Sequence, residues 1–362
     1  VKKERKQAQD ELTELRKILN IDDTIALKEF IEKINGWKEK ERQIMSDMRI
    51  VDFHCDTLMG GWQNPDWKLR ENEGHIDLMK LKEGQALCQL FAVWISRKAM
   101  ETTNPYEYYR ALVDIYHREM DANTDLIRKA RSWQEIMDNK AAGKMSGMLS
   151  IEDGVCFEGK IERVEEAYND DVRMVGLLWN FENEIGYPCR DDREEHLRGL
   201  KPFGFEVIEE MNRLGMIIDL SHSSEGVFYD VAKHSKQPFI ASHSCARALC
   251  GHRRNLDDAQ LKLLGEKGGV VGLNFYNYFL NDDESQFTFD RAAEHCKHIA
   301  DKAGIEALAL GSDFDGIDET GEMVNYRNMP VLLDRLNKYF TMDQIDLIAG
   351  GNALRIMKDV LK

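Results

Sequence analysis

The sequence predicts a (β/α)8 barrel of the TIM type, in the α/β class, preceded by a helical extension. Three observations predict it. Eight short apolar runs recur from Met48 onward, amphipathic stretches separate them, and the runs are almost continuously apolar. Such runs are typical of parallel strands that are covered on both faces. At 362 residues the chain has the length of one such barrel with an appendage.

Residues 1–47 differ in composition from the rest and are expected to form the helical extension. Glu, Lys, Leu and Ile dominate this segment, and acidic side chains stand three or four residues from basic ones, as in Glu29 and Lys33. Because the segment supplies no polar groups suited to catalysis, we expect it to pack on the main domain or on a partner. The barrel domain is then residues 48–362.

The eight predicted strands follow one another along the barrel domain. They are residues 49–56, 86–95, 146–153, 173–180, 216–222, 238–244, 270–276 and 308–314. Helical stretches separate them, for example one that follows an N-cap at Ser223 or Ser224 and one within residues 255–269 that closes on glycines. Strands that alternate with helices over about 300 residues indicate a closed parallel barrel.

Charge and composition exclude several classes of partner. The formal net charge of −16 argues against nucleic acid, whose binding proteins present basic surfaces. There is no run of about 18 apolar residues, so no membrane span is expected. The basic N-terminus has no apolar core and is not a secretory signal as written. The seven cysteines lack CxxC spacing and are expected to be reduced thiols, which predicts a cytoplasmic protein.

Ionisable residues stand at the ends of five predicted strands, and the carboxyl ends of the strands form the catalytic face of this architecture. The first strand contributes His54 and Asp56, which point to the same side because strand side chains alternate. His222 and His243 are 21 residues apart, one strand–helix unit, and are expected on neighbouring strands. The full set is His54, Asp56, Glu152, His222, His243 and Asp313.

Six such groups at one end of a barrel indicate a metal centre. A single buried histidine is usually a packing residue, but six unpaired ionisable groups would be costly to remove from water. Imidazole and carboxylate without clustered thiols suit Zn²⁺ or a similar divalent ion. Five ligands are too many for one open catalytic zinc and suit two ions that share a bridging carboxylate.

The spacing assigns a role to each of the six residues. Glu152 is the expected bridge between the ions. His54 and Asp56 complete one ligand set with it, and His222 and His243 complete the other. Asp313 is then left to act as general base and acid, with Asp315 as the rival for that role.

These residues, in this order, resemble the renal (membrane) dipeptidase family of binuclear zinc peptidases, within the amidohydrolase-like barrels. The matching stretches are "FHCDT", "SIEDG", "GMIIDLSHSS", "ASHSCARAL", "HRRNLDD", "GGVVGLNFY", "GSDFDG" and "GGNALRI". The resemblance implies hydrolysis of small dipeptides, including those with a C-terminal D-residue, by a metal-bridging hydroxide. It also implies the five ligands above, Asp313 as the catalytic carboxylate, and a homodimer, since members tend to be dimeric.

The resemblance further implies residues that contact the substrate. Arg254, with Arg253 as the neighbour that could be confused with it, is expected to bind the free carboxylate through two parallel hydrogen bonds. Trp179 stands where several members have a histidine that contacts the scissile carbonyl. The metals then stabilise the oxyanion alone, or the loop that follows supplies Asn180 or Asn183. Tyr276 or Tyr278 is expected to line the pocket.

Two other functions stay open at this point. One is another amidohydrolase reaction on an amide or ester, such as a lactone, a phosphotriester or an N-acyl amino acid. HxD in place of HxH, and Glu152 in place of a modified lysine, argue against the phosphotriesterase-like branch. The other is a catalytically silent barrel that binds amino acids or peptides.

Overall fold

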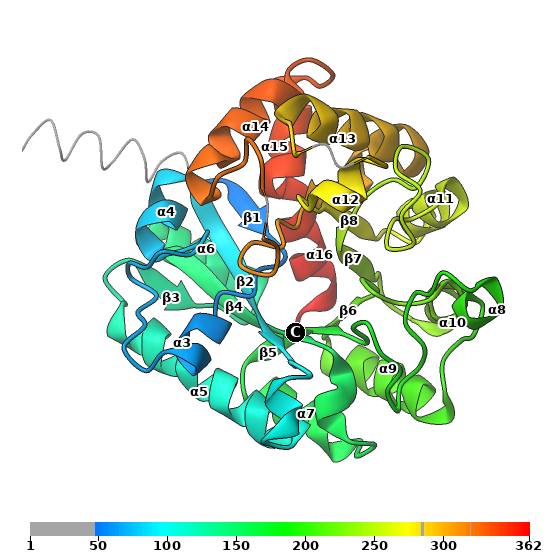
Figure 1. The fold of residues 1–362 in the computed structure, drawn as a ribbon. Helices are drawn as coiled ribbons and strands as arrows, with labels where there is room; N and C mark the ends of the chain where they lie inside the picture. Colours follow the sequence, from blue (N-terminus) through cyan, green and yellow to red (C-terminus); the bar gives the residue numbers. More distant parts are fainter. Residues whose placement is uncertain (1–47, 284–285, 319) are drawn as a thin grey trace, which may run out of the picture. The chain divides into compact units, whose positions relative to one another are not determined.

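The fold is a closed parallel β-barrel surrounded by helices, as the sequence predicts (Figure 1). The computed structural model describes residues 48–283, 286–318 and 320–362, so the predicted extension at 1–47 lies outside the described residues. The barrel strands are β1 (Ile50–Asp52), β2 (Ala86–Trp94), β4 (Met145–Glu152), β5 (Val172–Gly176), β6 (Ile217–Asp219), β7 (Ile240–Ser244), β8 (Val270–Leu273) and β9 (Leu308–Leu310).

The barrel closes because β2 pairs in parallel both with β1 and with β4. Around the circle the order is β1, β2, β4, β5, β6, β7, β8, β9. Each predicted strand corresponds to one of these eight. A ninth strand, β3 (Ile127–Lys129), pairs with the start of β4 and was not predicted from the sequence.

Helices surround the strands (Figure 1). The longer ones are α4 (Leu78–Glu83), α5 (Pro105–Ala122), α6 (Trp133–Ala141), α7 (Glu162–Asn169), α9 (Pro202–Leu214), α10 (Glu225–His234), α11 (Asp258–Glu266), α13 (Phe289–Ala303), α14 (Met329–Leu336) and α16 (Asn352–Val360). Shorter ones are α3 (Met59–Gln63), α8 (Arg193–His196), α12 (Asn277–Leu280), α15 (Met342–Asp346) and a π-helical turn at Leu347–Gly351. Ser224 is the N-cap of α10, since its side chain accepts a hydrogen bond from the backbone N–H of Val227 at 3.1 Å.

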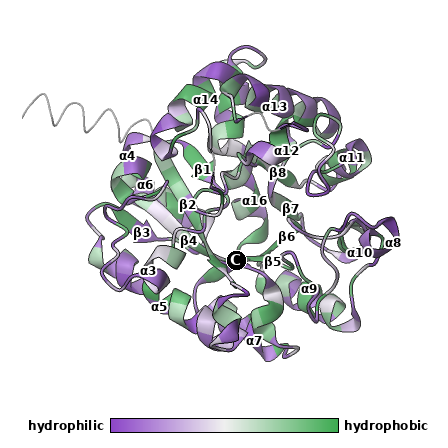
Figure 2. Ribbon diagram, viewed as in Figure 1, coloured by the Kyte–Doolittle hydropathy of each residue, from purple (hydrophilic) through white to green (hydrophobic). Residues whose placement is uncertain are grey.

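Hydrophobic residues concentrate on the strands, whereas the outer helices alternate hydrophobic and hydrophilic residues (Figure 2). All residues of β1, β4, β5, β6, β7, β8 and β9 are buried. Burial on both faces explains why the strands are continuously apolar in sequence. Polar side chains are therefore expected only where the strands end.

Candidate metal centre

The six ionisable residues predicted at the strand ends come together at the carboxyl end of the barrel. Glu152 is the last residue of β4, and His243 lies within β7. The other four follow their strands by two to four residues, because β1, β6 and β9 are shorter than predicted. The residues that follow their strands are His54, Asp56, His222 and Asp313.

His54 stands at the centre of one half of this cluster. Its Nε2 atom lies 3.4 Å from Oε2 of Glu152, 3.6 Å from Oδ2 of Asp56 and 3.8 Å from Oδ1 of Asp313. His54 is only 1% exposed. One nitrogen therefore faces three carboxylates in a space from which water is largely excluded.

The other half of the cluster is formed by two histidines and the second oxygen of Glu152. Oε1 of Glu152 lies 2.8 Å from Nε2 of His222 and 3.6 Å from Nε2 of His243. The two Nε2 atoms are 3.1 Å apart. Glu152 thus directs one oxygen to each half of the cluster, which is how a carboxylate is arranged when it bridges two cations.

The donor set fits divalent cations. Nε2 of His54 and Oδ1 of Asp56 are buried and have no hydrogen-bond partner among the described residues. Such orphaned atoms are costly unless a ligand satisfies them. Ligand atoms of His54, Glu152 and His243 lie within 4.8 Å of one another, as do those of His54, Asp56 and Asp313. Imidazole and carboxylate are the ligands that zinc accepts in catalytic sites.

The electrostatics of the cluster also favour bound cations. Burial, against the opposing effect of His54 and with a smaller contribution from Asp56, raises the pKa of Glu152 to about 8. Burial likewise raises the pKa of Asp313 to about 6. Burial and the nearby Arg254 guanidinium lower the pKa of His222 well below its usual value, so its imidazole is neutral, the form that binds metals.

Neighbouring side chains fix the orientation of two of the imidazoles. Nδ1 of His222 lies 3.0 Å from Oδ1 of Asn180, and Nδ1 of His243 lies 2.8 Å from Oγ of Ser242. The Ser242 hydroxyl donates to Oδ2 of Asp219 at 2.6 Å and therefore accepts from His243. In both histidines the proton is then on Nδ1, and the lone pair of Nε2 is directed into the site.

Two buried aspartates, which were not identified from the sequence, accept hydrogen bonds that hold the backbone next to the cluster. Asp52 accepts hydrogen bonds from the backbone N–H and the hydroxyl of Ser312, at 2.8 and 2.7 Å, and so ties β1 to the chain after β9. It also accepts from the backbone N–H of His54 at 3.3 Å. Asp219 makes the corresponding bonds to Ser242, from β6 to β7. Each is a carboxylate inside an apolar strand, two or three residues before a histidine of the cluster, and that pattern was the available signal.

Asp313 and Asp315 have different surroundings. Oδ2 of Asp313 accepts from the side-chain amide of Asn274 at 2.8 Å, and Oδ1 faces His54. Oδ2 of Asp315 accepts from the hydroxyl of Thr57 at 2.6 Å, and Oδ1 accepts from the backbone N–H of His75. Both oxygens of Asp315 are therefore occupied, while Asp313 keeps one oxygen directed at the cluster.

A cavity of about 350 Å³ opens above the cluster, and its lining includes Asp56, Glu152, His222 and Asp313. Three residues expected to contact the substrate, Trp179, Asn180 and Tyr276, also line it. Tyr278 is 46% exposed and is not among the lining residues. Asn183 is buried in its own loop, where it binds Asp153 and the backbone carbonyl of Leu177.

Arg254 is buried beside the cavity, whereas Arg253 is bound at the surface. Arg254 is 5% exposed, and its guanidinium carbon lies 5.3 Å from the ring centre of Phe279, which lines the cavity. Its Nη2 donates to the carbonyl of His243 at 3.4 Å, and its Nε has no partner among the described residues. Arg253 instead forms an ion pair with Asp191 at 2.8 Å.

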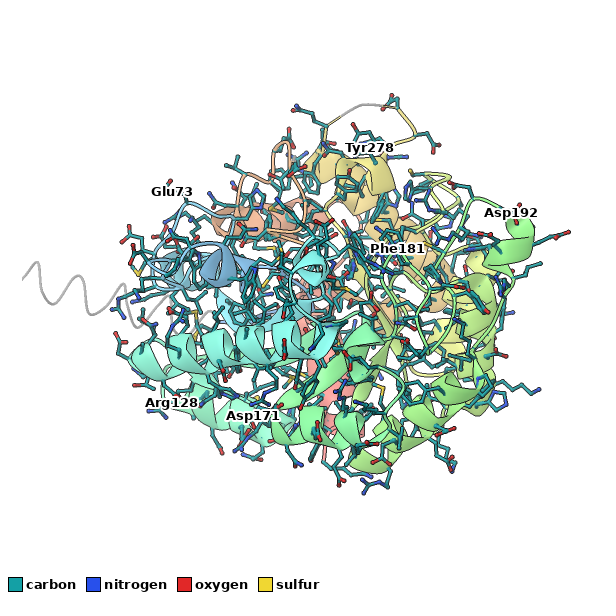
Figure 3. All side chains as sticks on the ribbon, turned by 60° about the horizontal axis from the view of Figure 1, so that its bottom comes forward. Glu73, Arg128, Asp171, Phe181, Asp192 and Tyr278 are labelled. Carbon is teal, nitrogen blue, oxygen red and sulfur yellow. The ribbon has the colours of Figure 1, made fainter. Side chains whose placement is uncertain are left out.

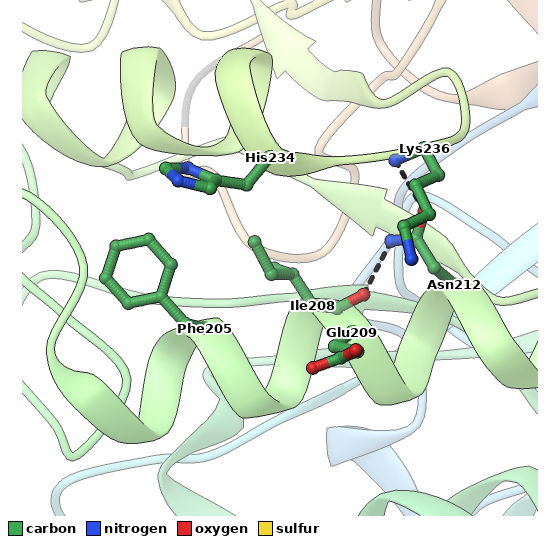
Figure 4. Close-up of a pocket in the computed structure, with 6 residues that line it drawn as sticks. All are labelled: Phe205, Ile208, Glu209, Asn212, His234 and Lys236. Atoms are coloured by element: carbon green, nitrogen blue, oxygen red, sulfur yellow. Dashed lines mark hydrogen bonds between the residues drawn. The ribbon is translucent and has the colours of Figure 1, made fainter.

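A second hollow, of about 210 Å³, lies between α9 and α10 (Figure 4). It is lined by Phe205, Ile208, Glu209, Asn212, His234 and Lys236. Asn212 accepts from the backbone N–H of Lys236 at 2.8 Å and so joins the two helical segments. Among the described residues, no candidate group of metal ligands includes a residue of this hollow. Separately, none of the helices in the part of the chain that the structure describes combines the length and the apolar composition that a membrane span requires.

Known proteins match this chain in sequence and in fold. The model of the membrane dipeptidase family, peptidase family M19, matches residues 38–362. An uncharacterised dipeptidase of Schizosaccharomyces pombe is 31% identical over 89% of this chain and 82% of its own length. The dipeptidase aclJ of Aspergillus oryzae is 28% identical over 92% of this chain and 83% of its own. The fold matches, at a TM-score of 0.81, a metallopeptidase from Rhodobacter sphaeroides liganded with a phosphinate mimic of L-Ala-D-Ala. The two are 24% identical, and the match covers 87% of this chain and 99% of that one.

Proposed function

The chain belongs to the membrane dipeptidase family, peptidase family M19, and on this premise we propose that it hydrolyses dipeptides with two zinc ions. One observation carries the proposal: Glu152 directs Oε2 to His54 and Oε1 to His222 and His243. His54, Asp56 and Glu152 would hold one ion, and Glu152, His222 and His243 the other. When bound, two such cations lower the pKa of water and stabilise negative charge on a carbonyl oxygen.

The chain's own residues bind the substrate and move protons. Arg254 binds the free carboxylate of the dipeptide, and a cavity of about 350 Å³ suits a substrate of this size. Asn274 holds Oδ2 of Asp313, so Oδ1 is free to accept a proton from the attacking water and return it to the leaving amine. Asn180 commits its Oδ1 atom to His222 and therefore positions that ligand.

The remaining parts of the proposal concern stereochemistry, location and assembly. The substrates include dipeptides with a C-terminal D-residue, the stereochemistry of the mimic bound to the Rhodobacter protein. The seven cysteines are free thiols and are all buried, which supports a cytoplasmic location. Three statements stay predictions: that the protein is a homodimer, that the chain divides into an extension at 1–47 and a barrel domain at 48–362, and that it binds neither nucleic acid nor membranes.

Metal analysis together with a dipeptide assay tests the function. The purified chain of 362 residues should contain two zinc ions and hydrolyse members of a panel of L,L and L,D dipeptides. Chelation should lower kcat/KM at least about 100-fold, and added zinc should restore it, because the metals supply the main charge stabilisation. Two ions with turnover only of another amide or ester would instead favour a different amidohydrolase. No ions and no turnover would favour a silent binding protein.

Replacing Arg254 by Met should weaken binding of the free carboxylate of the dipeptide. We expect kcat/KM for a dipeptide to fall about 100-fold or more, since loss of a buried charged partner costs roughly 2–5 kcal/mol. The variant should also lose the preference for a dipeptide over its C-terminal amide. Arg253→Met is the matched control, because Arg253 is bound to Asp191 at the surface, and it should behave as wild type. An unchanged Michaelis constant in Arg254→Met would rule out this role.

A further inference from the structure

A row of aromatic side chains forms one wall of the cavity. Trp94 is the last residue of β2, and Trp179 follows β5; their rings lie 5.0 Å apart in an edge-on arrangement. The ring of Phe181 lies 5.7 Å from that of Trp179, and Phe181 as a residue is 41% exposed. Figure 3 marks the position of Phe181. Trp94 and Trp179 line the cavity that contains Glu152, and Phe181 extends their row outward. We call Trp94, Trp179 and Phe181 the aromatic wall.

The barrel topology places the Trp94 end of this wall opposite Arg254. Around the circle, three strands separate β2 from β7 in either direction: β1, β9 and β8 on one side, and β4, β5 and β6 on the other. Trp94 ends β2, and Arg254 lies in the connection that follows β7. Trp94 is also directly opposite Glu152 in the pairing of β2 with β4. By strand order, the metal ligands therefore lie between Trp94 and Arg254, and Trp179 and Phe181 continue the wall from β5.

This order fixes the direction of a bound dipeptide, given the proposed function. The C-terminal carboxylate is bound at Arg254, and the scissile carbonyl lies at the metal ligands. The residue on the other side of the scissile bond is the N-terminal one, so its side chain extends toward the aromatic wall. An apolar side chain gains from contact with aromatic rings because both surfaces leave water.

We propose that the aromatic wall is the specificity site for the N-terminal side chain, and that the enzyme selects dipeptides with a large apolar residue there. This inference rests on the proposed function and names its substrate class. One further observation agrees with it. The guanidinium of Arg97 lies 4.2 Å from the ring centre of Phe181 and repels cationic side chains.

The first test compares two dipeptide series. Wild type should prefer Leu-Ala to Gly-Ala by at least about 10-fold in kcat/KM, as hydrophobic pockets do. Trp179→Ala and Trp94→Ala should each reduce the preference for Leu-Ala to about 3-fold or less. In the second series, which varies the C-terminal residue, the ratio of kcat/KM for Ala-Leu to that for Ala-Gly should stay unchanged. Trp62→Ala is the control, because Trp62 is 42% exposed and does not line the cavity. Trp179→Phe should keep much of the preference, since an aromatic face remains.

A binding measurement separates failure of this inference from failure of the proposed function. Calorimetry on the zinc-loaded chain would give the Kd of phosphinate mimics of Leu-Ala and Gly-Ala, with no turnover required. The inference is supported, even for an inactive preparation, if wild type binds the Leu-Ala mimic more tightly than the Gly-Ala mimic and Trp179→Ala does not. Suppose that dipeptides are hydrolysed but the variants keep the wild-type preference for Leu-Ala over Gly-Ala, or change only the preference for Ala-Leu over Ala-Gly. The aromatic wall is then not the specificity site. Equal Kd values for the two mimics in wild type would overturn it as well.

Discussion

Glu152→Gln is expected to abolish the proposed binuclear centre and to lower kcat/KM at least about 1,000-fold, because in that proposal both ions share the carboxylate of Glu152. The substitution keeps the size and shape of the side chain. It replaces one carboxylate oxygen by an NH2 group, which donates hydrogen bonds and cannot bind a cation. Since Oε1 and Oε2 face different histidines, either orientation of the amide removes a ligand from one half of the cluster. Zinc content should fall from two ions per chain to one or none.

The control for this variant is Glu165→Gln on α7, where the glutamate is exposed at the surface. It removes the same charge from the chain and should retain two ions and full activity. Circular dichroism should give the same secondary structure for both variants. If Glu152→Gln still bound two ions and turned over dipeptides at the wild-type rate, the bridging role of Glu152 would be wrong.

The sequence was sufficient to predict the barrel because each buried strand is a separate apolar run. It was not sufficient to predict where the strands end. The predicted strand 216–222 stops at Asp219, and 308–314 stops at Leu310. His222 and Asp313 have φ values of 67° and 63°, a left-handed conformation that non-glycine residues rarely adopt. Nothing in the local sequence indicates that turn.

The missed strand β3 and the supporting hydrogen bonds have a different cause. β3 has three residues, of which only Ile127 is buried, so it leaves no apolar run in the sequence. The bond from Ser242 to Asp219 joins residues on two neighbouring strands. Its existence depends on side-chain directions in the folded barrel. The clustering of the ionisable residues was predictable because parallel strands all end at the same edge.

Asp313→Asn should lower kcat about 100- to 10,000-fold, because the amide can neither accept nor return the proton. The substitution suits the backbone, since asparagine tolerates the left-handed conformation of residue 313 better than most residues. The amide oxygen can still accept from Asn274, so the side chain should keep its position. Zinc content and the Michaelis constant should change little. A loss confined to kcat, with the metals retained, is the result expected of a residue that transfers protons.

Asp315→Asn is the control that makes this test specific, because it is the same substitution two residues away, at a φ of 65°. Both carboxylate oxygens of Asp315 accept hydrogen bonds, from Thr57 and from the backbone of His75. One of those acceptors becomes a donor in Asp315→Asn, so this variant should lose about 1–3 kcal/mol of stability while kcat changes little. Thermal unfolding and steady-state kinetics on both variants separate the two roles. The reverse pattern, with kcat lost in Asp315→Asn and kept in Asp313→Asn, would transfer the proton-transfer role to Asp315.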